Sequence, residues 1–229
     1  MHLIDLQAYL SELSENNNRA WFVMNKPRYD ILRAEFLQLV TELIQGISKF
    51  DGAIAGCEAK KALFRINRDV RFAHDKSPYK TTFSASILPS GRKKPSEGGG
   101  PAYYFQIDAN GSLFFACGEY MPPSDRLRAI RQHIVADPEG FEKMLKNKKL
   151  KSGFGTLQEE GKLSRPPKGF APELKHIEQI KLKNFMVWAD CPIKGMDSSQ
   201  LKSVLLNAFQ NGWPLVEWLR SVEQDYSGA

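Results

Sequence analysis

The densest group of charged side chains lies between residues 65 and 81, in the stretch RINRDVRFAHDKSPYKT. It contains three arginines, two lysines and two aspartates. Arginine carries a planar, permanently charged guanidinium whose N–H groups match the oxygens of phosphates and carboxylates. Because five cations face two acids, positive charge remains for a bound anion. We therefore predict a site for a small phosphorylated or carboxylated ligand in this stretch. The predicted ligand-binding residues are Arg65, Arg68, Arg71, Lys76 and Lys80.

Three side chains of the same stretch are candidates for a catalytic role. Asp69 or Asp75 would orient an arginine or act as a general base, and Tyr79 would donate a hydrogen bond to the bound molecule. No residue in the chain identifies a leaving group or a nucleophile. The sequence therefore leaves open whether the protein is an enzyme or only binds its ligand.

Two other interpretations of the charged stretch stay open. Pairs such as Arg65 with Asp69 would stabilise the fold if buried, since removing one partner of a buried pair costs about 3–5 kcal/mol. The protein would then be a structural or interaction module. Alternatively, the basic segment, the loop at 91–95 and aromatic side chains on a sheet would bind nucleic acid.

The net charge of +6 is concentrated in one part of the chain. Residues 60–94 contain ten Lys or Arg and two Asp, a local balance of +8. Residues 1–59 sum to −3, and residues 95–229 sum to +1. A local excess favours one anion site over a surface that is basic throughout.

Other chemistries lack their motifs. The chain has no G-x-x-x-x-G-K-[ST], H-E-x-x-H, G-x-S-x-G or G-x-G-x-x-G pattern. Its four histidines lack the spacing of metal ligands, and its three cysteines include no C-x-x-C pair. No apolar run approaches the roughly 20 residues that cross a bilayer, and the acidic N-terminus is unlike a signal peptide. We therefore predict a cytoplasmic protein without metal, cofactor or membrane contact.

The elements around the charged stretch follow from the apolar periodicity. Helices are predicted at 4–15, 27–48, 124–135, from 138, at 171–180 and from 198, the last interrupted near Gly212 and Pro214. Strands are predicted at 62–66, 81–88, 102–107, 112–118 and 184–191.

The middle of the chain is therefore the β region. Asn110-Gly111 is a strong signal for a two-residue hairpin. The fold predicted for 1–229 is a single α+β domain, with an antiparallel meander packed by N-terminal and C-terminal helices. We expect Tyr104 and Phe105 both to belong to the core.

The charged stretch also resembles a known signature. R-I-N-R-D-V-R-F-A-H-D-K-S-P-Y is similar to R-x-x-R-D-x-R-F-x-x-x-D-K-x-x-Y, which is typical of a bacterial family of uncharacterised proteins of about this length. The segments NNRAWF, GGGPAYYFQI and RPPKGF also resemble family features, so the likeness covers the whole chain. The family has no established activity. The resemblance therefore supports the location of a site and leaves its chemistry open. The matching residues are Arg65, Arg68, Asp69, Arg71, Phe72, Asp75, Lys76 and Tyr79.

Overall fold

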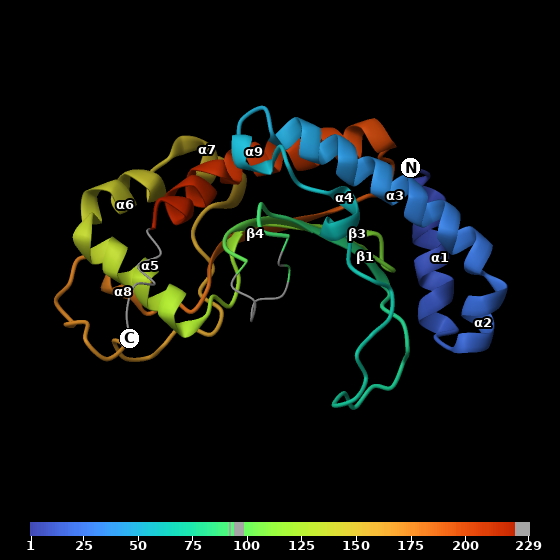
Figure 1. Ribbon diagram of the computed structural model, residues 1–229, viewed down its shortest axis with the longest axis horizontal. Coiled ribbons are helices and arrows are strands. Elements are labelled where there is room, and N and C mark those ends of the chain that lie inside the picture. The colour runs from blue at the N-terminus through green and yellow to red at the C-terminus, as the bar shows by residue number, and fades with distance from the viewer. Residues whose placement is uncertain (92, 94–98, 223–229) are drawn as a thin grey trace.

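The computed structural model, which describes residues 1–91, 93 and 99–222, is an α+β fold. A four-stranded antiparallel sheet from the middle of the chain is flanked by N-terminal and C-terminal helices, as predicted (Figure 1). The strands are β1 (Thr82–Ile87), β2 (Ala102–Asp108), β3 (Ser112–Glu119) and β4 (Phe185–Pro192). The helices are α1 (Leu3–Glu15), α2 (Arg19–Met24), α3 (Lys26–Ile47), η1 (Gly52–Ile54), α4 (Ala59–Ala62), α5 (Ser124–Ala136), α6 (Pro138–Leu145), α7 (Lys148–Phe154), α8 (Ile177–Ile180) and α9 (Ser198–Ser221).

The sheet is a meander in the order β1-β2-β3-β4, and each neighbouring pair is antiparallel. The predicted hairpin between β2 and β3 is confirmed, but its loop has three residues, 109–111, instead of the two predicted. Gly111 has a φ of 74°, a left-handed value that favours glycine. The Asp108 carboxylate accepts hydrogen bonds of 2.9 Å from the backbone N–H groups of Asn110 and Ser112. The turn chemistry therefore fixes the register of the two central strands.

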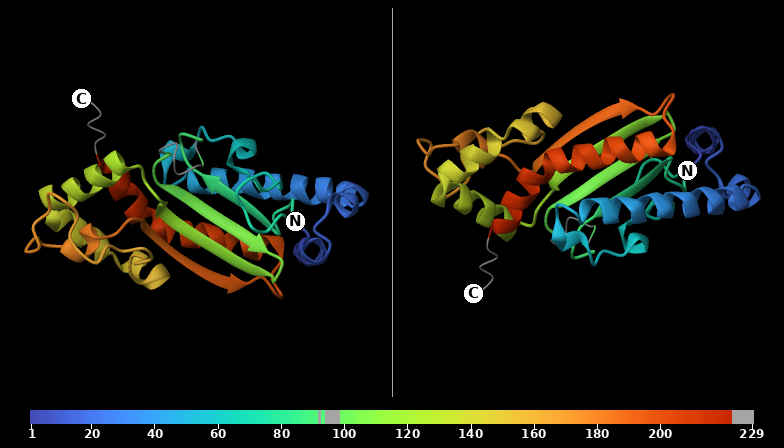
Figure 2. Two further views of the ribbon diagram at one scale, coloured as in Figure 1. Left: turned by 90° about the horizontal axis from the view of Figure 1, so that it is seen from below. Right: turned by 90° about the horizontal axis from the view of Figure 1, so that it is seen from above.

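Helices α3 and α9 cover one face of the sheet, and the other face is open (Figure 2). Side chains alternate along each strand, so every second residue points to the helices. On that face the Phe36 ring lies 5.4 Å from the Phe83 ring, and the Phe209 ring lies 5.3 Å from the Tyr103 ring. One core of buried apolar side chains joins sheet and helices, and it reaches from α1 to the end of α9. The assignment of the whole chain to one domain stays a prediction.

The prediction of a strand at 62–66 is wrong. Ala62 ends the short helix α4, and Leu63 forms an isolated bridge with Ala85. The N–H of Phe64 donates to the carbonyl of Ser84, so a regular antiparallel ladder would place Ile66 opposite Thr82. The carbonyl of Ile66 instead accepts from the N–H of Lys80, two residues away from Thr82. This shift prevents a regular ladder. The segment still follows the outer edge of β1, which brings Phe64 onto the open face.

The predicted interruption of the last helix is also wrong, because α9 continues through Pro214. Proline inside a helix costs about 3 kcal/mol, but burial of the following apolar residues, Leu215 and Val216 among them, offsets this cost. Gly212 has a packing role instead. A Cβ atom at this position would lie 2.4 Å from the Sγ of Cys117, so glycine permits the close approach of α9 to β3.

Smaller differences concern short helices. Helices α2 and α7 were not predicted, and each is preceded by an asparagine whose side chain accepts hydrogen bonds from backbone N–H groups of the helix. Helix α8 covers only the last four residues of the predicted 171–180 helix. His176 precedes it in a left-handed conformation with φ of 62°, which ends any helix upstream. No helix within the described ranges combines the length and the apolar character that crossing a membrane requires.

Candidate functional site

The charged stretch forms a long hairpin, residues 66–80, which we call the arm. It leaves the β1 edge and projects on the side of the open sheet face (Figure 1). Two backbone hydrogen bonds close its base. The N–H of Arg68 donates to Pro78 over 2.9 Å, and the N–H of Lys80 donates to Ile66 over 2.8 Å. The arm is thus held by the same kind of pairing as a strand, but beyond the edge of the sheet.

Tyr79 fixes the base of the arm to the N-terminal helices. The Asn17 side chain donates to the carbonyl of Tyr79 over 2.9 Å and accepts from its N–H over 3.0 Å. The Tyr79 ring is 8% exposed and stacks on Phe22, with centroids 4.1 Å apart and planes at 19°. This predicted hydrogen-bond donor to a ligand is therefore part of the packing under the arm.

The two aspartates of the arm pair with two of its arginines. An Nη2 atom of Arg71 lies 2.7 Å from the Asp69 carboxylate, which lowers the pKa of Asp69 to about 2. Arg68 pairs with Asp75. The Asp75 carboxylate also accepts from the hydroxyl and N–H of Ser77, at 2.6 and 2.9 Å, and these bonds and Arg68 hold its pKa well below the usual range.

The arm is therefore largely self-paired. Lys76 also bonds within it, donating to the carbonyl of Val70 over 3.0 Å. The proposed pairing of Arg65 with Asp69 does not form, because Asp69 bonds to Arg71. At the tip Phe72 is 95% exposed, with the Arg71 guanidinium 5.9 Å from its ring centroid.

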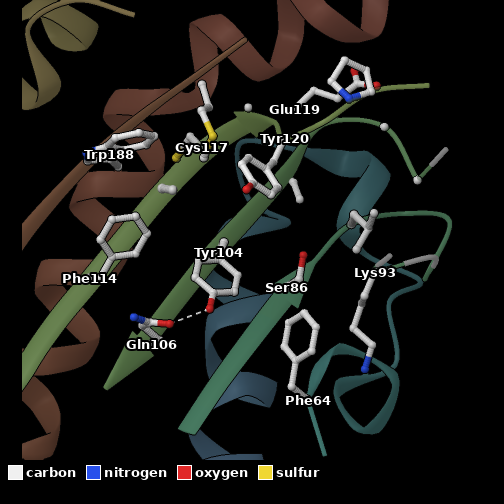
Figure 3. A pocket seen from close by; sticks show the side chains of 18 of the residues that line it. Phe64, Ser86, Lys93, Tyr104, Gln106, Phe114, Cys117, Glu119, Tyr120 and Trp188 are labelled. Atoms are coloured by element: carbon white, nitrogen blue, oxygen red, sulfur yellow. Dashed lines mark hydrogen bonds between the residues drawn. The ribbon is translucent and has the colours of Figure 1, made fainter. Parts of the chain in front are cut away.

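A hollow of about 510 Å³ occupies the open face of the sheet (Figure 3). Its floor includes the small residues Ala102, Ala116 and Gly118. Tyr120, Pro122 and Pro123 line it beyond the end of β3, and Glu160 lines it from a loop. Small residues under large ones leave a depression that the protein's own side chains do not fill. None of Arg65, Arg68 and Arg71 lines this hollow.

A row of four aromatic rings crosses the open face. The rings belong to Phe64, Tyr104, Phe114 and Trp188, and each ring centroid lies 6.1 Å from the next. All four side chains line the hollow, and all four are half-buried. We call these residues the ring row.

The strand register explains the ring row. Tyr104 lies opposite Ala116, and Ala116 lies opposite Trp188, so a small residue separates two large ones. Gln106 lies opposite Phe114 in the next row. Neighbouring strands are about 4.8 Å apart, so the Cα atoms of Tyr104 and Trp188 are separated by roughly 10 Å.

Two polar side chains are ordered inside the ring row. The Tyr104 hydroxyl donates to the Oε1 of Gln106 over 2.8 Å, which turns the Gln106 amide nitrogen away from the tyrosine (Figure 3). Burial raises the pKa of Tyr104, so this hydroxyl stays protonated and remains a donor. The Gln106 NH₂ group donates to no other described residue.

Cations gather at the Phe64 end of the row. The Nζ atoms of Lys80 and Lys93 each lie 5.1 Å from the Phe64 ring centroid. Burial, and then the charge of Arg65, lower the pKa of Lys80. Within the part of the chain that the structure describes, Arg65 and Lys80 form no ion pair with an acid. Lys80 therefore lies beside Phe64, which lines the hollow, but neither Lys80 nor Arg65 lines the hollow itself.

Of the two acids that line the hollow, Glu119 and Glu160, the first has a cationic partner. Glu119 is buried and pairs with Arg126 over 3.1 Å. Arg126 also donates to the carbonyls of Leu219 and Val222, at 2.6 and 3.0 Å. This pair joins β3 to α5 and the end of α9. Among the described residues, no three His, Cys, Asp or Glu side chains are placed to hold a metal ion.

The sequence interpretation missed the ring row, although a signal for it exists. Tyr103, Tyr104 and Phe105 are consecutive, as are Phe114 and Phe115. Because strand residues alternate between faces, consecutive aromatics must occupy both faces. The expectation that Tyr104 belongs to the core is therefore wrong, whereas Phe105 is fully buried as expected.

A model of a family of conserved hypothetical proteins, DUF2461, matches residues 5–218. No curated protein and no solved structure gives a significant match. The family match includes the arm, the sheet and the ring row, and it extends over most of α9. The chain therefore belongs to the DUF2461 family, as its resemblance to a family of uncharacterised proteins indicated.

Proposed function

We propose that the protein binds a small planar organic anion in the hollow on the open sheet face. The observation that carries this proposal is the ring row above a floor of small residues, with the Lys80 ammonium beside the Phe64 ring at one end of the row. A volume of about 510 Å³ lies within the usual range for small-molecule sites. Such sites are lined by apolar and aromatic side chains with a few placed polar groups, as here.

The ring row favours a planar ligand. A flat ring placed over Ala116 would contact the aromatic side chains on both sides of it, Tyr104 and Trp188. Aromatic rings gain about 0.5–1.5 kcal/mol from offset or edge-to-face contacts beyond simple burial. The half-buried state of the rings leaves part of their surface available for such contacts.

The cations favour a negative group on that ligand. Burial and the charge of Arg65 both disfavour the charged form of Lys80. A bound carboxylate or phosphate would favour that form again, because an opposite charge nearby stabilises an ammonium. Glu119 at the other end already has Arg126 as its partner, so it would not repel the anion strongly.

This proposal divides the charged stretch into two parts. Arg65 and Lys80 contribute to binding, whereas Arg68, Arg71 and Lys76 shape the arm together with its aspartates. The catalytic roles predicted for Asp69, Asp75 and Tyr79 stay predictions. We propose binding and assign no reaction.

Thermal shift and calorimetry with a panel of organic anions would test the proposal. We expect planar aromatic carboxylates and phosphates to raise the melting temperature, and their uncharged analogues to do so much less. Ala116→Leu should fill the hollow and remove the effect, because the larger side chain enters empty space. Ala136→Leu, at an exposed position of α5, is the matched control. Absence of stabilisation by every charged compound at millimolar concentration would refute the proposal.

A further inference from the structure

We infer that Gln106 determines which planar ring the hollow accepts, and that this ring carries a hydrogen-bond acceptor on its edge, such as a ring nitrogen or a carbonyl oxygen. The inference rests on the proposed function and narrows its ligand class to heteroaromatic or carbonyl-bearing rings. It concerns the ring of the ligand alone, and it depends on side chains from the open face of β1, β2 and β3.

A directed chain of hydrogen bonds orients the Gln106 amide. The Tyr104 hydroxyl donates to the Oε1 of Gln106 over 2.8 Å. Ser84, which lies opposite Gln106 on β1, also hydrogen-bonds to Tyr104. Burial raises the pKa of Tyr104, whereas the bond with Ser84 lowers it, which is the effect of a bond that the phenol oxygen accepts. The proton of Tyr104 is therefore directed to Gln106, and the chain runs from Ser84 through Tyr104 to Gln106.

The amide nitrogen of Gln106 is the end of this chain. Because the amide oxygen is bonded to Tyr104, the NH₂ group points away from the tyrosine (Figure 3). Gln106 lines the hollow, and its NH₂ group donates to no other residue in the described ranges. The single hydroxyl proton of Tyr104 is already donated. A ligand in the hollow therefore meets a hydrogen-bond donor at this point.

The strand register places this donor beside the position of the ring. A flat ring over Ala116 would contact Tyr104 and Trp188. Gln106 lies opposite Phe114, two residues before Ala116 on β3, so Gln106 and Ala116 are diagonal neighbours on the same face. Diagonal neighbours are about 7–8 Å apart, within reach of a long side chain. The amide can therefore reach the edge of a ring that stacks in the ring row.

The edge of the ring decides whether this amide is satisfied. A hydrocarbon ring would remove water from the NH₂ group without replacing its hydrogen bonds, and an unsatisfied donor weakens binding. A ring with an N–H on its edge would place one donor against another. An acceptor on the edge restores the lost hydrogen bond. Glutamine and asparagine amides recognise heteroaromatic edges by such bonds in other proteins.

Calorimetry with bicyclic carboxylates of equal charge would test the inference at neutral pH. The compounds are 2-naphthoate, its quinoline and isoquinoline counterparts with the nitrogen at each ring position, and indole carboxylates. We expect at least one nitrogen counterpart to bind about tenfold more tightly than 2-naphthoate, and the indoles to bind no more tightly than 2-naphthoate. If 2-naphthoate or an indole binds as tightly as the best nitrogen counterpart, the inference is overturned and the proposed function stands. If none of these carboxylates binds, the proposed function fails and the inference fails with it.

Gln106→Met would test the amide directly. Methionine keeps the length of the side chain and has no N–H donor, so the tenfold preference for the nitrogen-containing ring should disappear. Affinity for 2-naphthoate should be retained, which also shows that the variant is folded. Gln106→Glu keeps an acceptor for Tyr104 and removes the NH₂ group, so it should lose the same preference, although its added charge weakens all of the carboxylates. A preference that persists in Gln106→Met would overturn the inference.

Tyr104→Phe would test whether the amide is held in one orientation. Phenylalanine keeps the aromatic ring of the ring row and removes the proton that holds the Oε1 of Gln106. The amide could then turn its oxygen toward the hollow. We therefore expect the indole carboxylates to gain about fivefold in affinity relative to 2-naphthoate, which the loss of packing alone would not produce. An unchanged order of affinities would show that Tyr104 does not position the amide, and it would overturn the directed chain.

Discussion

The Nζ of Lys80 lies 5.1 Å from the centroid of the Phe64 ring, which places the charged stretch and the ring row in contact at one point. The two residues are sixteen positions apart, and the intervening chain forms the arm. They meet because the segment that contains Phe64 follows the outer edge of β1, with Phe64 bonded to Ser84. The charged stretch therefore meets the ring row at Lys80, although neither Lys80 nor Arg65 lines the hollow itself.

Removal of the Lys80 charge should weaken anion binding. Lys80→Gln is expected to reduce the affinity for a planar aromatic carboxylate by about tenfold, since hydrogen bonds to charged groups contribute about 1.5–3 kcal/mol. Arg68→Gln, whose guanidinium bonds to Asp75 in the arm, should change affinity less than about twofold. Calorimetry on both variants gives the comparison. A larger loss of affinity in Arg68→Gln than in Lys80→Gln would show that the anion binds at the arm.

Anion binding should also weaken at alkaline pH. Burial and Arg65 lower the pKa of Lys80, so its charge is lost at a lower pH than that of an ordinary lysine. Affinity should be highest below this pKa and should fall as pH rises through it. Lys80→Arg should give a flat profile over the same range, because arginine stays protonated. An aromatic carboxylate is the suitable ligand, since its own charge is constant there. Identical profiles for wild type and Lys80→Arg would contradict the assignment.

The fold was more predictable from the sequence than the site was. Each strand of the sheet lies within about two residues of its predicted range, because alternating apolar residues and the Asn110-Gly111 turn are local signals. The irregular segment at 62–66 was not predictable in this way. Its shape depends on a pairing shift against β1, which no local pattern encodes.

The candidate site depends on register, which explains why its location was only partly foreseen. Charge counting found Arg65 and Lys80, but it could not separate them from cations that pair inside the arm. The depression over Ala116 arises because small residues of one strand lie between large residues of its neighbours. That juxtaposition joins residues more than seventy positions apart in the sequence. The loop proposed for nucleic acid, 91–95, lies mostly outside the described residues, because only 91 and 93 are described.

The attachment of the arm should depend on Asn17. Its side chain makes two hydrogen bonds to the backbone of Tyr79, and each lost bond to a partly buried group costs about 0.5–1.5 kcal/mol. Asn17→Ala is therefore expected to reduce the free energy of unfolding by about 1–3 kcal/mol. Phe72→Ala, at the exposed tip of the arm, should change it by less than about 0.5 kcal/mol. Urea titrations would measure the change in the free energy of unfolding for both variants. Equal effects would show that Asn17 does not hold the arm.

Two ion pairs of the protein should differ sharply in their importance for stability. Arg126 is buried with Glu119 and has further bonds to backbone carbonyls, so Arg126→Met leaves a buried carboxylate and unpaired carbonyls. Its expected cost is about 3–5 kcal/mol. Arg68→Met breaks a pair whose acid is mostly exposed, and its expected cost is below about 1 kcal/mol.

Chemical unfolding of these two variants also decides between two views of the charged stretch. If its main role were to stabilise the fold, Arg68→Met would approach the cost of Arg126→Met. A small cost for Arg68→Met, together with faster proteolysis between residues 66 and 80, would show that Arg68 and Asp75 order the arm and little else. The exposure of Phe72 at the tip supports this second outcome, since an arm that only supported the core would bury the aromatic side chain at its tip.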